Sequence, residues 1–209
     1  MADYNEITEI VQTGKMKQVE EAVSAVANKD NAKAVLDSMI KGMDIIGDKF
    51  QRNEAFVPEM LAAAMTMQKG VAVIKPLLGD EDAAGLGTVV IGTVAGDLHD
   101  IGKNLVALMF EGAGFEVNDL GVDVPADKFI EAIKADPNVK IVAISALLTT
   151  TMPAMKETVE AIKAAGLDEG RSIMIGGAPI TQEFADEIGA NAYTPDAGST
   201  AKKAKELVA

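Results

Sequence analysis

The chain has a single histidine, His99, and an aspartate, Asp97, two residues before it. In an extended loop, residues i and i+2 can face the same way, so Asp97 can accept a hydrogen bond from the imidazole. That contact would fix the tautomer and raise the basicity of the ring while its other nitrogen binds a metal. Gly96 and Gly102 would let the backbone approach a bulky group. A lone histidine is more often a surface or capping residue, so this spacing alone does not establish a site.

Further small and hydroxyl-bearing residues follow two other predicted strands. Ser145 ends one of these strands and is followed by three threonines at 149–151, and Gly176-Gly177 ends the other. Taken singly, the serine would satisfy a strand end and the glycines would form a turn. The carboxyl ends of neighbouring parallel strands meet at one edge of a sheet, so these groups and His99 should converge. The residues alone predict one metal or cofactor ligand in a pocket at that edge.

The second part of the chain alternates between short β-branched runs and helical stretches, which is typical of an α/β fold. Runs 88–93 and 141–145 are the most apolar and suit central strands, whereas 115–119 carries Glu116 and Asn118 and suits an edge. We expect a flavodoxin/Rossmann-like five-stranded parallel sheet in the order 2-1-3-4-5, with a ligand at the switch point between the first and third strands. The expected strands are 88–93, 115–119, 141–145, 172–175 and 191–193, and the expected helices are 101–113, 125–135, 152–165, 180–188 and 198–208.

The first part of the chain has a helical period and no strand-like run. Four helices fit between Asn5 and Leu78, with Pro58 in the first turn of the fourth, which should reach about Leu77. The period is clearest in Val35, Met39, Met43, Ile46 and Phe50, and the breaks fall near Gly14, 28–31 and 51–53. We therefore expect a four-helix bundle.

A short acidic segment separates the two patterns. Residues 79–85 are small, acidic and bounded by glycine, which is typical of a linker between two cores. The sequence therefore predicts a helical bundle cap domain over 1–84 and an α/β domain over 85–209.

Composition excludes several classes of protein. A net charge of −13 and a pI near 4.5 would repel the phosphate backbone of nucleic acid. The lack of cysteine excludes disulfides, thiolate zinc sites and cysteine nucleophiles, and one histidine excludes a site with several imidazole ligands. No apolar run approaches the ~20 residues that span a bilayer, and the first residues lack the features of a signal peptide. We expect a cytoplasmic protein with no nucleic-acid or membrane partner.

Taken together, the motifs resemble those of a known family. The series Asp97-x-His99-x-x-Gly102, Ser145-x-Leu147 and Gly176-Gly177 is similar to the corrinoid-binding signature of cobalamin-dependent methyl carriers. The segments 42–50 and 56–59 resemble the helical cap of the same family. The resemblance covers nearly the whole chain, and it is strongest to the small corrinoid proteins of three-component methyltransferase systems and to the cobalamin module of methionine synthase.

The resemblance implies a role for each matching residue. His99 would be the metal ligand, binding the cobalt of a cobalamin or related corrinoid in the base-off, His-on mode, with Asp97 and Thr151 completing a proton relay. The nucleotide tail would enter between strands one and three, and Phe50 and Val57, with Met43 as a further candidate, would form an apolar lid over the upper face. The implied cofactor-binding residues are Gly96, Asp97, Leu98, His99, Asp100, Ile101, Gly102, Ser145, Leu147, Thr149, Gly176, Gly177, Tyr193, Ala197, Phe50 and Val57.

The function that the resemblance implies is methyl transport. The methylated cofactor would be the intermediate between a substrate-specific methyltransferase and an acceptor methyltransferase that serves a folate or a thiol, with a reductive activator as a further partner. The chain itself shows no independent catalytic site. Three alternatives stay open: a cobalamin-dependent sensor or regulator, the small subunit of an adenosylcobalamin mutase, and a flavodoxin-like domain that binds no cobalt. The methyl donor, the final acceptor and the oligomeric state are not recorded in the sequence.

Overall fold

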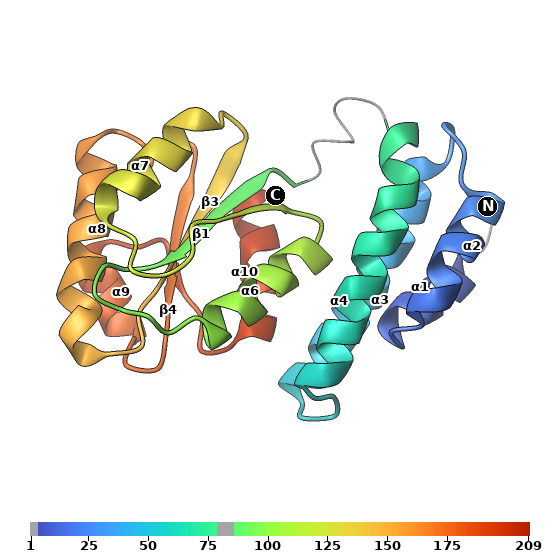
Figure 1. Cartoon of the computed structure of the whole chain (residues 1–209), viewed down its shortest axis with the longest axis horizontal. Coiled ribbons are helices and arrows are strands. Elements are labelled where there is room, and N and C mark those ends of the chain that lie inside the picture. The colour runs from blue at the N-terminus through green and yellow to red at the C-terminus, as the bar shows by residue number, and fades with distance from the viewer. Residues whose placement is uncertain (1–3, 79–85) are drawn as a thin grey trace. The chain divides into compact units, whose positions relative to one another are not determined.

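The computed structural model describes residues 4–78 and 86–209, which form two compact units. One unit is helical and the other contains a sheet covered by helices, as predicted (Figure 1). The predicted linker over 79–85, and with it the domain boundary between residues 84 and 85, lies outside the described residues. Among the described residues, none of the helices combines the length and the apolar character needed to cross a lipid bilayer.

The helical unit contains the four predicted helices. Their bounds are α1 (Asn5–Gln12), α2 (Met16–Val26), α3 (Ala32–Gln51) and α4 (Val57–Ile74), and a short 3-10 helix, η1 (Lys75–Leu77), follows. The α-helical part of the last element ends at Ile74 rather than near Leu77. Pro76 explains the difference, because proline lacks the N–H that a continuing α-helix would need.

The core of this unit is aliphatic and sulfur-rich. Val35, Met39, Met43 and Ile46 of α3 are buried, which confirms the predicted stripe, and Phe50 at its end is half-buried. Methionines of α4, Met60 and Met67, fill the same interior. At the start of α4, Glu59 accepts a hydrogen bond from the Phe56 N–H at 2.9 Å, which satisfies a donor of the first turn.

The α/β unit contains a five-stranded sheet that is parallel throughout, in the order β2-β1-β3-β4-β5. This confirms the predicted strand order. The strands are β1 (Thr88–Thr93), β2 (Glu116–Asp119), β3 (Val139–Ser145), β4 (Ser172–Gly176) and β5 (Ala192–Tyr193). The helices are α6 (Ile101–Gly112), α7 (Ala126–Ala135), α8 (Met152–Ala164), α9 (Gln182–Ile188) and α10 (Ala197–Val208), and a short 3-10 helix, η2 (Thr149–Thr151), precedes α8.

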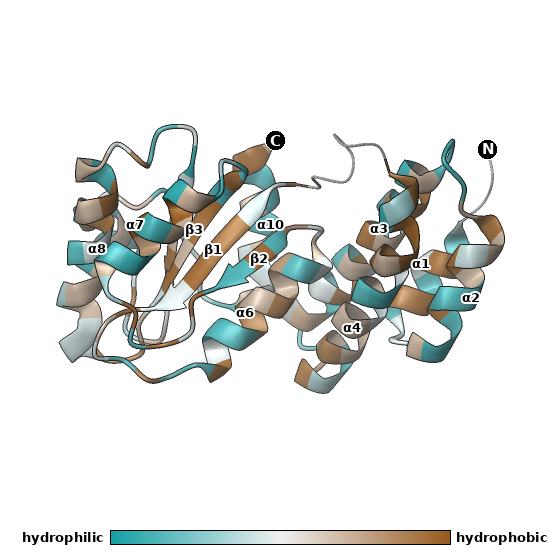
Figure 2. Ribbon diagram, turned by 45° about the horizontal axis from the view of Figure 1, so that its top comes forward, coloured by the Kyte–Doolittle hydropathy of each residue, from teal (hydrophilic) through white to brown (hydrophobic). Residues whose placement is uncertain are grey.

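Helices cover both faces of the sheet. Figure 1 shows α7, α8 and α9 on one face and α6 and α10 on the other. The main core lies under the first group, where Phe129 of α7 and Met155 of α8 pack with alternate residues of the central strands. Every residue of β1 is buried, whereas three of the four residues of β2 are exposed, so β2 is an edge strand as predicted. Figure 2 shows the same contrast in hydropathy.

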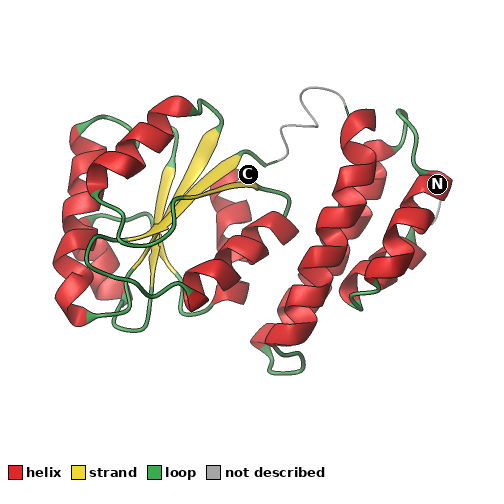
Figure 3. Ribbon diagram, viewed as in Figure 1, coloured by secondary structure: helices red, strands yellow, loops and turns green. Residues whose placement is uncertain are grey.

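The carboxyl ends of the three middle strands lie in register. Thr93 pairs with Ser145 across β1 and β3, and Ser145 pairs with Gly176 across β3 and β4. The chain leaves β1 toward β2 on one side and leaves β3 toward β4 on the other, so the loops that follow the two strands diverge (Figure 3). A crevice at this point is the usual ligand position in open α/β sheets.

Gly177, just after β4, has a backbone conformation that only glycine adopts easily. Its φ is +132°, and a Cβ at this position would overlap the carbonyl oxygen of Ala146. Ala146 follows β3, and its N–H donates to Gly176 O at 3.1 Å. A glycine is therefore required for the two strand ends to approach each other, independently of any ligand.

We expect Gly177→Ala to lower the free energy of unfolding by about 3 kcal/mol, because it combines a strained φ with a steric overlap. Gly166→Ala is the matched control: Gly166 also has a positive φ, +64°, but a Cβ there would meet no atom within 4 Å. The control should cost only about 1 kcal/mol. Urea unfolding followed by circular dichroism would measure both, and equal losses would contradict the assigned overlap.

Candidate functional site

Asp97 is the polar centre of the crevice. It lies in the loop between β1 and α6, and its side chain is completely buried. One carboxylate oxygen, Oδ1, accepts from the His99 ring Nδ1 at 2.7 Å and from the His99 backbone N–H at 3.1 Å. The other, Oδ2, accepts from the Leu147 N–H at 2.7 Å and from the Thr151 hydroxyl at 2.8 Å. A single carboxylate thus joins the loops that follow β1 and β3.

The local sequence folds the loop around this carboxylate. The bond from the His99 N–H to Asp97 Oδ1 is an Asx-type turn, which aspartate favours because its side chain reaches the backbone two residues on. Gly96 supplies a φ of +79° just before it. The Thr93 hydroxyl at the end of β1 donates to the His99 carbonyl oxygen at 3.0 Å. These contacts bring the Asp97 and His99 side chains to the same side of the loop, as the i, i+2 spacing predicts.

The hydrogen bonds decide the ionisation of Asp97. Burial by itself would raise the pKa of this carboxyl, but the donors from Leu147, His99 and Thr151 outweigh it and hold the pKa well below its ordinary value. An ionised carboxylate only accepts hydrogen bonds, so the proton in the 2.7 Å contact belongs to His99 Nδ1. In the neutral imidazole, Nε2 then carries the free lone pair. Since half of the His99 side chain is exposed, Nε2 is available to a ligand.

Thr151 is the one threonine of 149–151 that is buried. Its hydroxyl lies 2.8 Å from Asp97 Oδ2 and 2.9 Å from the Leu148 carbonyl oxygen. A hydroxyl has a single hydrogen, and a charged acceptor gives the stronger bond, so donation to Asp97 is favoured. The structure therefore brings His99, Asp97 and Thr151 into one chain of hydrogen bonds.

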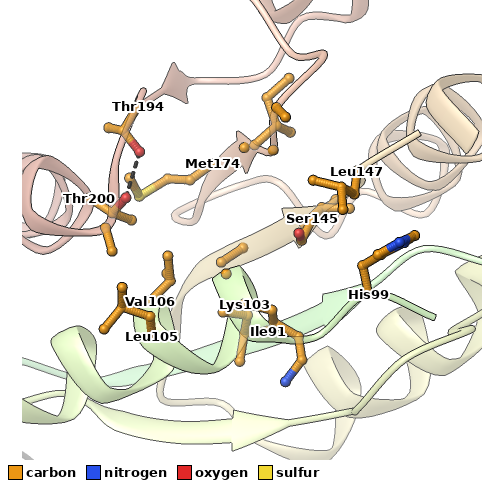
Figure 4. Close-up of a pocket in the computed structure, with 18 of the residues that line it drawn as sticks. Ile91, His99, Lys103, Leu105, Val106, Ser145, Leu147, Met174, Thr194 and Thr200 are labelled. Atoms are coloured by element: carbon orange, nitrogen blue, oxygen red, sulfur yellow. Dashed lines mark hydrogen bonds between the residues drawn. The ribbon is translucent and has the colours of Figure 1, made fainter. Parts of the chain in front are cut away.

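A cavity of about 540 Å³ extends from His99 between the sheet and helices α6 and α10. Figure 4 shows His99 at one end and Thr194 with Thr200 at the other, where the two hydroxyl oxygens are 2.6 Å apart. Side chains of the central strands and of α6 line the interval between these ends, and most of them are apolar. They include Ile91 of β1, Ala143 of β3, Met174 of β4, and Leu105 and Val106 of α6.

Most of the predicted binding residues line this cavity. These are Leu98, His99, Asp100, Ile101, Gly102, Ser145, Leu147, Gly176, Gly177, Tyr193 and Ala197. Gly96, Asp97 and Thr149 are not among the lining residues: Asp97 lies behind His99, and Gly96 and Thr149 are exposed. Phe50 and Val57 belong to the helical unit and not to the unit that contains the cavity, and their predicted role as a lid stays a prediction.

Sequence reasoning missed several residues of the site. The inner end of the cavity is lined by Met174, Thr194 and Thr200. A methionine in a strand, such as Met174, gives no sign in the sequence that it contacts a ligand. Lys103 is almost completely buried, and its ammonium bonds to Asp119 at the end of β2 and to Asn104 Oδ1. The sequence did carry a signal for Lys103. The spacing of apolar residues in α6 places this lysine on the inward face of the helix, where an unpaired lysine is rarely found.

Apolar side chains surround His99 at the surface. Leu98 is 72% exposed and Ile101 is 86% exposed, and Leu147 and Leu148 on the β3 side are each about 40% exposed. A flat apolar ligand lying on His99 would cover this collar, which we define as these four residues. In the described part of the chain, no group of three or more histidine, cysteine, aspartate or glutamate side chains could hold a metal ion. Within those residues, His99 offers a metal one imidazole nitrogen.

Comparison with known proteins agrees with this arrangement. Two family models, each described as a B12 binding domain, match residues 87–202 and 4–75. The chain belongs to the B12-binding family of corrinoid proteins. A corrinoid would bring most of the ligands of its cobalt with it, so one imidazole, an apolar collar and an adjoining cavity fit the group that this family binds.

Similar proteins match this corrinoid protein over its whole length. Dimethylamine corrinoid protein 1 of Methanosarcina acetivorans is 41% identical over 206 residues, which are 98% of this chain and 96% of that protein. A solved cobalamin-binding protein from Desulfitobacterium hafniense DCB-2 is 33% identical, with a TM-score of 0.82 over 99% of both chains. A chain of the methanol:cobalamin methyltransferase complex of Methanosarcina barkeri is 27% identical, with a TM-score of 0.82 over 97% of this chain and 78% of that one. These matches confirm the resemblance found in the sequence.

The lowered pKa of Asp97 predicts a pH dependence of stability. A group with a depressed folded pKa stabilises the fold above its unfolded pKa, about 4, and this stabilisation is lost as the pH falls further. The free energy of unfolding of the wild type should therefore exceed that of Asp97→Asn by about 2 kcal/mol near pH 7, which is the contribution of hydrogen bonds to a charged group. The difference should shrink below about pH 4.

Urea unfolding at a series of pH values would measure this difference. Asp136→Asn is the control, because the Asp136 side chain accepts one bond, from the Asn138 N–H, at the opposite end of the strands. A difference between wild type and Asp97→Asn that stays constant from pH 7 to about pH 3 would contradict the ionisation assigned to Asp97.

Proposed function

We propose that this corrinoid protein carries a methyl group between two methyltransferases. A substrate-specific methyltransferase would load the bound corrinoid, and a second enzyme would pass the methyl group to a folate or thiol acceptor. One observation carries the proposal: the only histidine presents a free Nε2 at the mouth of a cavity, with its Nδ1 held by a buried carboxylate. Metal-binding histidines are oriented in this way in many proteins.

His99 Nε2 is the proposed axial ligand to cobalt, in the base-off, His-on mode. The cavity beside it would then take the tail of the cofactor that ends in the displaced base. Its volume of about 540 Å³ is within the range of small-molecule sites, and its apolar strand residues suit an aromatic base. When bound, the corrinoid supplies a cobalt centre that can accept a methyl group in one oxidation state and give it up in another.

The three hydrogen-bonded side chains have a proton role in this proposal. With no metal on His99, Nε2 would be free to take a proton. The ionised Asp97, 2.7 Å from Nδ1, would stabilise the positive charge of the ring. The Thr151 hydroxyl can donate to Asp97 or to the Leu148 carbonyl oxygen, so it can follow the charge on the carboxylate. Asp97 and Thr151 would thus adjust how strongly His99 binds.

The collar has a shielding role. Leu98 and Ile101 on the β1 side and Leu147 on the β3 side would lie against the underside of the macrocycle and exclude water from the histidine. The role of Phe50 and Val57 as a lid stays a prediction, and Met43, the further candidate, is buried in the core of the helical unit.

The partners follow from the relatives. Similar proteins are named for dimethylamine and trimethylamine, and another forms part of a methanol:cobalamin methyltransferase complex. We propose a methylated amine as the source of the methyl group, because the dimethylamine and trimethylamine proteins are each 41% identical to this chain while the methanol protein is 27% identical. A reductive activator that restores the cofactor after oxidation completes the proposed set of partners.

Two alternatives have less support. A DNA-binding regulator does not suit a net charge of −13. The small subunit of an adenosylcobalamin mutase has less support because the cap segments 42–50 and 56–59 resemble those of the methyl carriers, and the family match over 4–75 extends across those segments.

We expect the spectrum of the reconstituted protein to depend on His99. The wild type, loaded with hydroxocobalamin without oxygen, should give a base-off, His-on spectrum, and reduction should give a Co(I) band. In His99→Gly, the imidazole ligand is lost while the cavity remains, so the corrinoid should stay bound with a shifted spectrum. Added imidazole should restore the wild-type spectrum in this variant.

Ultraviolet–visible spectroscopy under anaerobic conditions would measure these states. Thr150→Ala is a control, because Thr150 is exposed and is not among the cavity-lining residues; its spectrum should match that of wild type. Loss of all corrinoid from the wild type, or a spectrum that does not change when His99 is replaced, would exclude the proposed ligand.

A further inference from the structure

Asp123, in the loop after β2, has an unusual backbone conformation. Its φ is +54°, and among the described residues Asn53 is the other non-glycine residue with a positive φ. Residues other than glycine occupy this region at a cost, although aspartate and asparagine tolerate it better than most. Such strain persists where surrounding contacts compensate for it. The contacts of Asp123 are therefore informative.

Asp123 holds the segment Gly96-Asp97 at both ends. Its N–H donates to the Asp97 carbonyl oxygen at 3.0 Å, and its side-chain Oδ1 accepts from the Gly96 N–H at 2.7 Å. Gly96 itself has a positive φ, +79°. The turn that carries the Asp97 side chain toward His99 is thus fixed from outside by one residue of a different loop.

These contacts are additional to the pairing of the sheet. The next residue, Val124, already donates to the Thr93 carbonyl oxygen at 2.9 Å and forms an isolated parallel bridge with Val94. The loop after β2 would therefore remain beside β1 without the Asp123 side chain. What the carboxylate adds is a fixed position for the Gly96 N–H, one residue before Asp97.

We propose that Asp123 is a positioning residue for His99. By holding Gly96-Asp97, it keeps Asp97 Oδ1 at hydrogen-bond distance from His99 Nδ1, and so keeps the proton on Nδ1 and the lone pair on Nε2. Its relevance to cobalt rests on the proposed function. The effect on the imidazole is a property of the chain alone, and it can be measured without a cofactor.

The single histidine makes the test direct, because all imidazole signals in a nuclear magnetic resonance spectrum come from His99. Two-dimensional ¹H–¹⁵N spectra of the full-length protein without corrinoid, at a fixed pH where the ring is neutral, distinguish the Nδ1–H from the Nε2–H tautomer. In Asp123→Gly, the positive φ is retained without strain and only the carboxylate is lost. We expect the Nδ1–H to Nε2–H ratio to fall about fivefold, which corresponds to one net hydrogen bond.

Asp123→Asn should rescue the ratio, since asparagine tolerates the left-handed region and keeps a side-chain oxygen as acceptor. Asp136→Gly is the control: it removes a carboxylate of the same unit that also accepts a backbone N–H, from Asn138 at 2.8 Å, and it should leave the ratio unchanged. A wild-type ratio in Asp123→Gly, or an equal fall in Asp136→Gly, would overturn the proposal.

A measurement on the wild type covers the case in which Asp123→Gly does not fold. In amide hydrogen exchange, the Gly96 N–H should exchange at least about tenfold more slowly than the N–H of the exposed Leu98 in the same loop. Equal exchange rates would overturn the proposal, because the Oδ1 contact would then not be maintained. Neither experiment depends on cobalamin, so a protein that shows the expected ratio and exchange but binds no corrinoid would refute the proposed function and leave this inference standing.

Discussion

The site depends on one buried carboxylate. Asp97 carries its negative charge in a position with no solvent exposure, and such a charge is tolerated only where hydrogen-bond donors replace the lost water. Four donors do so: two from His99, one from the Leu147 N–H and one from the Thr151 hydroxyl. Two of them belong to the loop after β1 and two to the segment after β3. Removing the charge would leave all four donors with a weaker acceptor.

The parallel sheet makes this arrangement possible. Strands β1 and β3 are neighbours, and Thr93 and Ser145 at their ends are paired, so the two loops start side by side. Because the chain then turns to opposite sides of the sheet, the loops separate and leave the crevice open. Asp97 joins the two loops, and the cavity extends from His99 toward Thr194 and Thr200. The same topology thus provides both the ligand at the mouth and the space behind it.

The sequence predicted the elements well because their signals are local. β-branched runs, helical periods and loop residues lie within about ten residues, and the strand order followed from which runs were most apolar. The contact of Asp97 with His99 was also predictable, since an i, i+2 pair in a loop needs no tertiary information. Thr151 came from family spacing, and the structure shows why it differs from its neighbours: the short helix η2 turns only this threonine inward.

The missed features all depend on contacts between distant segments. The hydrogen bond between the Gly96 N–H and the Asp123 carboxylate joins residues 27 apart in sequence. Nothing in the local sequence indicates that the backbone of Asp123 has a left-handed conformation. Gly177 was expected among the cofactor-binding residues, and its conformation and the approach of Ala146 require glycine even without a ligand. Met174 and Thr200 reach the cavity because β4 and α10 border it. Local patterns do not contain such information.

A cofactor held through one imidazole alone would depend on a single bond. In the proposed function His99 would hold the cobalt and the adjoining cavity would hold the tail of the cofactor. Attachment through His99 alone would release the cofactor whenever that bond is broken. A second attachment in the cavity would keep the cofactor beside His99 at a high effective concentration. Two separate attachments would account for the presence of one exposed imidazole and an apolar cavity in the same site.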